Sequence, residues 1–400
     1  MDVPKKILIA RFPLESAWGG EEEIHLVMAE IFRKHAIQTE LLSSCPYLSE
    51  RFQKEGFFVK EEFQKDITSD WRIFRNIFTL LCFFIRGLYW IPYFRYIRKV
   101  RTVLFLTLIE KLLWTPLAKL LGMRVYWGHH APLGTWLSKN PYLFLWKFWS
   151  QHVQIIVASG FMKKELSVFT NYPENILILP NTLSPKKDMS EVTMSSGSDF
   201  HKLLNMRAKI DREKEDLFLV GTASRLSPEK GMRDVIAAAE DLKSKNILFL
   251  CAGSGSEEKA LIKEIKAKGL RKVHLIGFLN PDEMRIFLQH IDLFVLPSHE
   301  EPFGLVLLEA MSTQKAIAAS YVGGIPEVLG AKNEGLFEVK NPDDLVQKIL
   351  FFEKNEALRK ELGQRNFAHF KKNYSGAEFE KKLLNIFKME SPSAIRETLI

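Results

Sequence analysis

The sequence predicts an α/β protein built from two doubly wound parallel sheets. Three observations support this prediction. Short apolar segments typical of buried strands alternate with amphipathic helices, the alternation stops in a polar region, and it then starts again. A chain of 400 residues is long enough for two such domains. Because open sheets bind ligands beyond the carboxyl ends of their strands, we expect a functional site in a cleft between the domains.

The N-terminal half begins with a predicted buried strand, Lys6–Ala10, and an amphipathic helix, Glu21–His35. Further short strands are expected at Val103–Thr107, Arg124–Trp127 and Gln154–Ala158. We therefore expect a first domain of the doubly wound, Rossmann-like kind over residues 1–182.

A polar segment containing KKDMSEVTMSSGSD follows and is typical of a linker, which we place at 183–216. A second Rossmann-like domain is expected over 217–370, with a helix from about Met232. A C-terminal helix at about 371–390 is expected to pack back on the first domain. The strands predicted for the second domain are Phe218–Ala223, Ile247–Ala252, Val273–Ile276, Leu293–Leu296 and Ala316–Ser320.

The composition restricts the partners and the compartment. A formal charge of +8 favours anionic partners such as phosphorylated substrates, anionic lipid or nucleic acid. The three cysteines are far apart in the sequence, which argues for a reducing compartment and against a disulfide scaffold or a structural zinc site. The apolar run Ile7–Ala10 is too short for a signal peptide, so we expect a cytoplasmic protein.

The stretch 71–101 combines many aromatic residues with seven Arg and Lys residues and no acid. Its longest uncharged run, Asn76–Ile85, is shorter than the roughly 20 residues of a membrane-spanning helix. One interpretation is a surface that presses into anionic lipid at the inner face of the membrane. The other is a buried helix pair whose arginines extend to the surface.

The segment PSHEEPFGLVLLEAM, residues 297–311, places two carboxylates around an apolar helix predicted to begin near Gly304. The first N–H groups of a helix lack internal partners and carry the positive end of its dipole, so a phosphate can bind there. Glu309 lies five residues further on, roughly 7 Å along the helix and about the step from a diphosphate to its ribose. We therefore expect Glu309 to bind ribose hydroxyls and Glu301 to face the group beyond the phosphate.

Residues 221–232, GTASRLSPEKGM, place Arg225 and Lys230 after the first strand of the second domain. Two cations at this position suit a diphosphate leaving group, since a guanidinium binds it as a fork and an ammonium as a point charge. A solvated basic loop is the alternative. The motif AGSG, residues 252–255, lacks the third glycine of a dinucleotide-binding motif and is expected to be a tight turn. The motif VGGIPEVL, residues 322–329, is explained equally well as a turn with a proline near the start of a helix.

Two motifs of the N-terminal half also follow predicted strands. WGG places Gly19 and Gly20 before a helix, where a flexible backbone suits an anion or a plain turn. VYWGHHAP, residues 125–132, places His129 and His130 just after a strand. Since adjacent side chains tend to point apart, we expect only one of them to face a substrate. The alternative is an aromatic-lined turn with one histidine bonded to the backbone.

The combination of Arg225 and Lys230 with PSHEEPFGLVLLEAM and GGIPE resembles the nucleotide-sugar half of the family 4 retaining glycosyltransferases. That family has the GT-B fold, in which two Rossmann-like domains face each other across a cleft. The similarity covers nearly the whole chain and is stronger in the second half. It implies a hexosyltransferase that moves a sugar from a nucleoside-diphosphate sugar to a hydroxyl acceptor, such as a saccharide, a lipid-linked saccharide or a surface glycan precursor.

The resemblance also implies roles for single residues. The family's pair of glutamates corresponds to Glu301, near the donor sugar, and Glu309, on the ribose. The loop of Gly19 and Gly20 would close on the donor phosphate or the acceptor. The groups that would hold the diphosphate are Arg225, Lys230 and the backbone around Gly304, Leu305 and Val306.

The family's active-site histidine corresponds best to His130, with His129 second. Ala131 stands where an acidic or small polar residue often follows the histidine, and the stretch 71–101 is more basic and aromatic than a minimal member of the family would need. These two departures leave the acceptor open. Gln314-Lys315 replaces a glycine that often follows the helix of the second glutamate, so we expect the end of that helix to have a different shape.

The chain has no D-x-D triplet, so no metal site and no cofactor beyond the donor co-substrate are expected. Another GT-B nucleotide-sugar enzyme, such as an epimerase or an inverting transferase, is the nearest alternative. An NAD-dependent oxidoreductase is disfavoured because the first strand is not followed by G-x-G-x-x-G. A nucleic-acid binder is disfavoured because no known binding motif is present.

Overall fold

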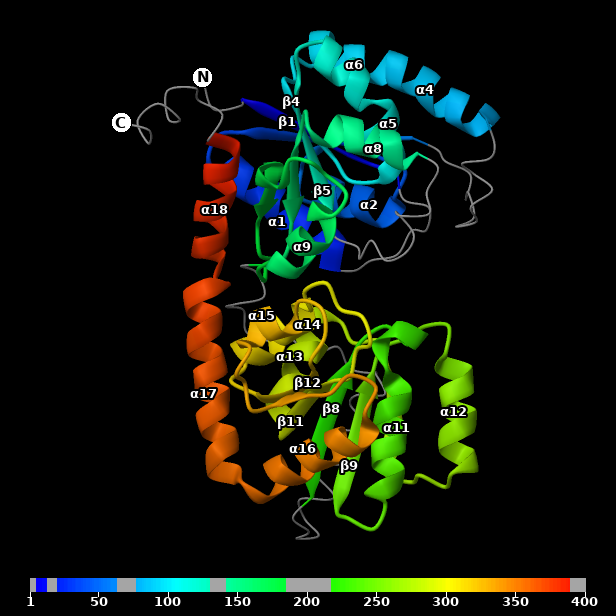
Figure 1. Cartoon of the computed structure of the whole chain (residues 1–400), viewed down its shortest axis with the longest axis vertical. Coiled ribbons are helices and arrows are strands. Elements are labelled where there is room, and N and C mark those ends of the chain that lie inside the picture. Colours follow the sequence, from blue (N-terminus) through cyan, green and yellow to red (C-terminus); the bar gives the residue numbers. More distant parts are fainter. Residues whose placement is uncertain (1–4, 13–19, 63–76, 130–141, 185–216, 389–400) are drawn as a thin grey trace. The chain divides into compact units, whose positions relative to one another are not determined.

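The residues that the computed structural model describes are 5–12, 20–62, 77–129, 142–184 and 217–388. They divide into two compact units. Unit 1 consists of the described residues within Met1–Ser184 and Ala377–Ile400, and unit 2 of those within Pro185–Gly376. Each unit is a parallel sheet flanked by helices (Figure 1).

Unit 1 has a seven-stranded sheet in the order β3-β2-β1-β4-β5-β6-β7, and every neighbouring pair is parallel. The strands are β1 Lys6–Arg11, β2 Gln38–Ser43, β3 Phe58–Glu61, β4 Thr102–Phe105, β5 Arg124–His129, β6 Gln154–Val157 and β7 Ile176–Ile178. The α-helices are α1 Gly20–Lys34, α2 Pro46–Lys54, α4 Ile77–Pro92, α5 Leu108–Leu113, α6 Thr115–Leu120, α8 Leu143–Ser150, α9 Gly160–Ser167 and α18 Gly376–Lys388. Two short turns of helix are the π-helix η1 Tyr93–Ile97 and the 3₁₀-helix η2 Pro173–Asn175.

Unit 2 has a six-stranded parallel sheet in the order β10-β9-β8-β11-β12-β13. The strands are β8 Phe218–Ala223, β9 Ile247–Ala252, β10 Val273–Gly277, β11 Leu293–Leu296, β12 Ala316–Ser320 and β13 Leu336–Phe337. The helices are the 3₁₀-helix η4 Pro228–Lys230 and α11 Met232–Asp241, α12 Glu258–Ala267, α13 Pro281–His290, α14 Leu305–Ser312, α15 Ile325–Leu329, α16 Pro342–Lys354 and α17 Glu356–Asn373.

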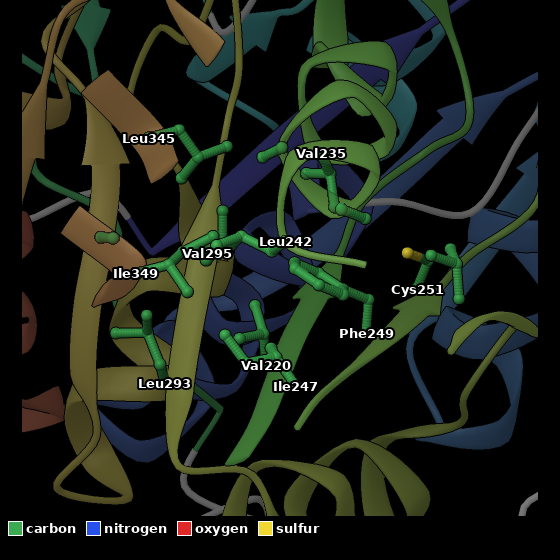
Figure 2. Packing of buried hydrophobic residues seen from close by; sticks show 14 of the residues in the cluster. Val220, Val235, Leu242, Ile247, Phe249, Cys251, Leu293, Val295, Leu345 and Ile349 are labelled. Carbon is green, nitrogen blue, oxygen red and sulfur yellow. The ribbon is translucent and has the colours of Figure 1, made fainter. Parts of the chain in front are cut away.

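The core of unit 2 shows why these segments form strands. β8 and β9 are buried along their whole length, as expected for strands covered on both faces. Alternate residues point to one face, where they pack against α11 and α16 (Figure 2). The residues labelled there are Val220, Val235, Leu242, Ile247, Phe249, Cys251, Leu293, Val295, Leu345 and Ile349.

Helix α18 completes the core of unit 1, although it lies near the other end of the chain. Phe387 packs edge-on against Phe32 of α1, with ring centroids 5.0 Å apart, and Glu380 lies 2.9 Å from the Nζ of Lys34. The helix begins at Gly376, not near residue 371, because α17 continues to Asn373 and ends at Tyr374. The hydroxyl of Tyr374 donates to the carbonyl of Glu327 at 3.2 Å.

The α/β fold of two parallel sheets is confirmed, and every strand expected from the alternation is present with ends shifted by no more than two residues. β2, β3, β7 and β13 were not predicted. β2 was missed because it contains Glu40, a charge in an otherwise buried strand. The carboxylate of Glu40 is paired with Arg98, 2.8 Å away, a contact that local sequence does not indicate.

Candidate functional site

The candidate site lies at the carboxyl ends of β8 and β11. Counted from β8, the strands of unit 2 follow the order third, second, first, fourth, fifth, sixth. From the first strand the chain proceeds toward one edge of the sheet, and from the fourth strand it proceeds toward the other edge. The place between these two neighbouring strands is the topological switch point, where doubly wound folds bind ligands. The loops that leave it are 224–231 after β8 and 297–304 after β11, which carry the predicted cations and Glu301.

Lys230 and Glu301 form an ion pair between these two loops. The Nζ of Lys230 lies 2.9 Å from Oε2 of Glu301, and the side chains are only 14% and 12% exposed. The hydroxyl of the buried Ser298 lies 3.5 Å from the same oxygen. Each charge offsets the desolvation of the other. The sequence predicted both residues at the site but not their contact.

Arg225 is placed differently, with a side chain that is 74% exposed and lies 4.0 Å from Glu229. Burial by itself raises the pKa of the Glu229 carboxyl. Hydrogen bonds from Ser227 and from the Glu229 backbone, with the charges of Lys230 and Arg225, outweigh burial and lower this pKa below its ordinary value. The loop therefore carries an anion between its two cations, which sequence reasoning did not anticipate.

Glu309 lies on the partly exposed face of α14, which explains a charge in an apolar helix. Leu305, Val306 and Glu309 share this half-buried face, as their spacing requires. Gly304 caps the helix with a φ of 88°, a left-handed conformation that glycine adopts without strain. The residues on the opposite, buried face are Leu307, Leu308, Ala310 and Met311.

Close backbone packing explains the two glycines of the GGIPE motif. Gly323 has a φ of 58°, and a Cβ on it would lie 2.0 Å from the carbonyl oxygen of Glu301. A Cβ on Gly324 would lie 2.2 Å from the carbonyl oxygen of Pro302. The N–H of Gly324 donates to the Glu301 carbonyl at 2.9 Å. The loop after β12 therefore supports the backbone of Glu301 and tolerates only glycine.

Gly231 holds the other side of the site in the same way. Its φ is 67°, and a Cβ would lie 2.0 Å from the carbonyl oxygen of Pro297. The N–H of His299 donates to the carbonyl of Glu229 at 2.8 Å. The loops after β8 and β11 are thus joined backbone to backbone, which fixes Lys230 relative to Glu301.

His299 is a site residue that sequence reasoning missed. Its Nε2 lies 2.8 Å from Oδ2 of Asp234 in α11, and its side chain is 21% exposed. The two residues are 65 positions apart, and no local pattern in the sequence indicates their contact.

The AGSG motif is explained by close backbone packing, as the GGIPE motif is. A Cβ on Gly253 would lie 1.8 Å from the carbonyl oxygen of Ser224.

The predicted residues of unit 1 are described only in part. Gly19 and His130 lie outside the described residues. Gly20 is the first residue of α1. His129 is the last residue of β5 and half-buried, so the expectation that it follows the strand is wrong. The strand continues through His129 because this residue pairs with Val157 of β6.

Two buried residues of α5 lie at the carboxyl ends of unit 1 strands and were not predicted. Oε1 of Glu110 accepts from the N–H groups of Phe12, after β1, and Thr107, after β4, at 3.3 and 3.0 Å. Burial raises the pKa of Glu110 although Thr107 donates to it. Lys111 donates to the carbonyl of Gly128 at 2.6 Å. The capping box of Thr107 and Glu110 was a signal that could have found this cluster.

The groups gathered at the β8/β11 switch point are cations, a hydroxyl, carboxylates and helix N–H groups, which suit an anion that carries hydroxyls. Among the described residues, no group of three or more His, Cys, Asp and Glu side chains is placed to hold a metal ion. Within the same part of the chain, no helix has the length and apolar character needed to cross a membrane.

Two doubly wound units of this kind define the GT-B class of fold. A solved structure with this architecture is that of the Anabaena protein HepE in complex with UDP-glucose, which matches with a TM-score of 0.73 at 16% identity. The match covers 95% of this chain and 98% of that protein. At such low identity the likeness shows the fold alone.

The C-terminal part of the chain matches a family model. Residues 206–369 match the model of the family described as Glycosyl transferases group 1. The resemblance found in the sequence is thereby confirmed at the level of group 1.

Two curated relatives agree with this assignment. An uncharacterized glycosyltransferase of Methanocaldococcus jannaschii is 28% identical over 240 residues, 59% of this chain and 60% of that protein. An O-antigen biosynthesis glycosyltransferase of Escherichia coli, WclY, is 30% identical over 174 residues, 43% of this chain and 47% of that protein. The chain thus spans less than two thirds of the length of either relative.

Proposed function

We propose that the chain is a glycosyltransferase that moves a sugar from a nucleoside-diphosphate sugar to a hydroxyl group of an acceptor. The observation that carries this proposal is the ion pair of Lys230 and Glu301 at the β8/β11 switch point, next to the loop that leads into α14. The family match of residues 206–369 supports the reaction class, and the HepE complex supports a nucleotide sugar as donor.

In the proposed donor complex, the diphosphate replaces Glu301 as the partner of Lys230. The first N–H groups of α14 lack partners within the helix and donate to the same phosphates. Arg225, whose side chain is exposed, closes over them from the solvent side. Glu301 then accepts from hydroxyls of the donor sugar, and Glu309, about one helical turn from the start of α14, accepts from the ribose.

The proposed chemistry follows from where charge develops. When the bond between the anomeric carbon and the phosphate oxygen breaks, negative charge grows on the diphosphate, and Lys230, Arg225 and the α14 dipole stabilise it. The acceptor oxygen bonds to the anomeric carbon on the face that the phosphate leaves, and its proton passes to the leaving phosphate oxygen. Retention of configuration, independence of a metal, and orientation of the acceptor by His130 or His129 belong to this proposal.

We further propose a saccharide acceptor, either free or carried by a lipid at the inner face of a membrane. The relative WclY, named for O-antigen biosynthesis, supports a glycan precursor. The basic and aromatic composition of residues 71–101 supports a lipid-linked one. A cytoplasmic location is part of the same proposal.

A thermal-shift panel of UDP, GDP, ADP and their sugars tests the donor. A ligand that binds the native state raises the unfolding midpoint by mass action, so the best nucleotide identifies the base. With that donor, sugar transfer should require an acceptor, and NMR of the product should show the anomeric configuration of the donor. Conversion of the donor sugar without acceptor would indicate an epimerase, and an inverted product would contradict retention.

A further inference from the structure

Helix α4 is apolar on both sides, and the described residues of unit 1 cover only one of them. On the inner side, a Cβ on Gly87 would lie 2.4 Å from the ring of Trp114, and the indole N–H of Trp114 donates to the carbonyl of Phe83 at 2.8 Å. Trp90 and Ile91 are also buried there.

The outer side of α4 is an exposed apolar stripe. Its residues recur at the spacing of one helical face and continue into η1. We call this surface the outer face of α4, with the exposed fractions Leu81 51%, Phe84 41%, Ile85 54%, Leu88 47%, Tyr89 63%, Tyr96 61% and Ile97 69%. Contiguous apolar surface of this extent marks an interaction site, because single scattered residues are what an ordinary surface shows.

The charge around this face is mostly positive. Residues 77–124 contain eight Arg and Lys residues and one acid, Glu110, which is buried. Arg95 donates to a neutral carbonyl, that of Leu121, at 2.8 Å, and Lys99 and Arg101 are exposed. Two cations are compensated by acids of other elements, since Arg98 lies 2.8 Å from Glu40 and Arg86 lies 3.8 Å from Glu62. The remaining cations form a border around the apolar residues.

We propose that the outer face of α4 docks on the surface of an anionic lipid bilayer. The helix would lie parallel to the membrane plane, with its apolar residues at the level of the headgroups and the border cations on lipid phosphates. Tyr89 and Tyr96 fit this position, since tyrosine prefers the boundary between lipid and water. With 16 residues, α4 is shorter than the roughly 20 of a spanning helix, which favours lying on the bilayer.

A second copy of the chain suits this face less well than lipid does. A two-fold contact would place the same patch of both copies together. Arg95 and Lys99 of one copy would then approach the same cations of the other, and the described part of α4 and η1 offers no acid to offset them. The proposal does not depend on the chemistry at the β8/β11 switch point.

Vesicle co-sedimentation of the full chain tests the proposal. Wild type should bind phosphatidylglycerol vesicles, bind phosphatidylcholine vesicles at least about tenfold more weakly, and dissociate as salt screens the surface charge. Leu88→Glu should lower binding to the anionic vesicles by about tenfold or more, since it places an acid in the apolar stripe. Val168→Glu is the matched control, because Val168 is 77% exposed at the end of α9 in the same unit and should bind as wild type does.

Two further measurements keep the test decisive. The unfolding midpoint of each variant shows that it folds, and Ile85→Ser repeats the test without adding charge. The proposal is overturned if wild type fails to bind anionic vesicles at low salt, if it binds neutral vesicles equally well, or if Leu88→Glu binds like wild type. It is also overturned if Leu88→Glu only converts a dimer in solution to a monomer, because the face would then join two copies.

Discussion

At the scale of single residues, the main feature of the candidate site is the ion pair of Lys230 and Glu301. Both side chains are largely buried, and each needs an opposite charge. A bound diphosphate would supply a new partner for Lys230, and sugar hydroxyls would supply new donors to Glu301. Donor binding is therefore expected to exchange one set of partners for another without leaving a buried charge unpaired.

Lys230 and Glu301 should stabilise unit 2 only when both residues are present. Lys230→Met leaves Glu301 buried without its cation and should lower the free energy of unfolding by about 3 kcal/mol. Adding Glu301→Leu should recover much of that loss while abolishing activity. Urea unfolding of the two single variants and the double variant measures the coupling.

An exposed pair in the same unit provides the control. Arg365 and Glu334 lie 2.8 Å apart, with side chains 52% and 41% exposed. Arg365→Met should lower the free energy of unfolding by less than about 1 kcal/mol. If Lys230→Met is no more damaging than Arg365→Met, the buried pair does not have the role assigned to it.

Glu110 should make the stability of unit 1 depend on pH. Burial raises the pKa of its carboxyl in the folded state above the ordinary value of 4.5, so the folded state holds this proton more tightly than the unfolded state. Its contribution is favourable below pH 4.5 and is lost as pH rises through the folded pKa. Urea unfolding of wild type and Glu110→Gln across this range should show stability falling with pH more in wild type, and a pH-independent difference would contradict the assignment.

At the scale of elements, the loops of unit 2 owe their shape to glycines that allow backbones to touch. Gly231 joins the loops after β8 and β11, and Gly323 and Gly324 join the loop after β12 to Glu301. Glycine has no side-chain group to offer a ligand. These glycines place the residues that do, so the GGIPE motif is explained by packing.

Gly323→Ala should therefore damage the site. A Cβ there would lie 2.0 Å from the Glu301 carbonyl, so the carboxylate loop must move, and nucleotide affinity and stability should both fall. Gly269→Ala is the matched control, since Gly269 has a φ of 63° with open space around it. The control should lose only the conformational energy of a left-handed alanine, about 1 kcal/mol. Equal effects in urea unfolding and nucleotide titration would show that the close contact has no consequence.

Helix α18 should be required for the stability of unit 1. Leu383 is fully buried in that core beside Phe379 and Phe387. Leu383→Ala should lower the free energy of unfolding by about 2–5 kcal/mol because it removes packing and leaves a cavity. Asn385→Ala, on the exposed side of the helix, should change it by less than about 0.5 kcal/mol. Denaturant unfolding of both variants measures these changes. Equal losses in the free energy of unfolding would mean that α18 is not part of the core.

Sequence predicted the elements well where burial is local. The strands β8, β9, β11 and β12 were predicted to the residue, because a short continuous apolar run bounded by turn residues is typical of a strand buried on both faces. β2 was missed because the partner of Glu40, Arg98, lies 58 residues away. Long-range pairs of this kind decide burial, but they leave no local pattern in the sequence.

At the scale of the whole molecule, the two units are assembled from the chain differently. Unit 2 is one continuous segment, whereas unit 1 combines the N-terminal residues with α18 near the other end of the chain. Both sheets place their first and fourth strands side by side. The same switch point therefore occurs in each unit, with Lys230 and Glu301 beside it in unit 2 and Glu110 in unit 1.

The residues of the candidate site could be proposed from the sequence, but their contacts could not. Charges that follow strands are visible in the chain, so Arg225, Lys230 and Glu301 could be named as candidates. The partners that orient them were not, because Asp234 meets His299 only after the sheet has formed. The acceptor histidine stays a prediction, since His130 lies outside the described residues.

We expect unit 2 to bind a nucleoside diphosphate with Lys230 on the phosphates and Glu309 on the ribose. This can be measured by isothermal titration of the preferred diphosphate into wild type, Glu309→Ala and the control Glu353→Ala, which changes a half-buried glutamate of α16. Glu309→Ala should raise Kd by about 10- to 100-fold, the loss of about 1.5–3 kcal/mol of charged hydrogen bonds. Glu353→Ala should bind as wild type does. Unchanged affinity in Glu309→Ala, or no binding of any diphosphate to wild type, would contradict this expectation.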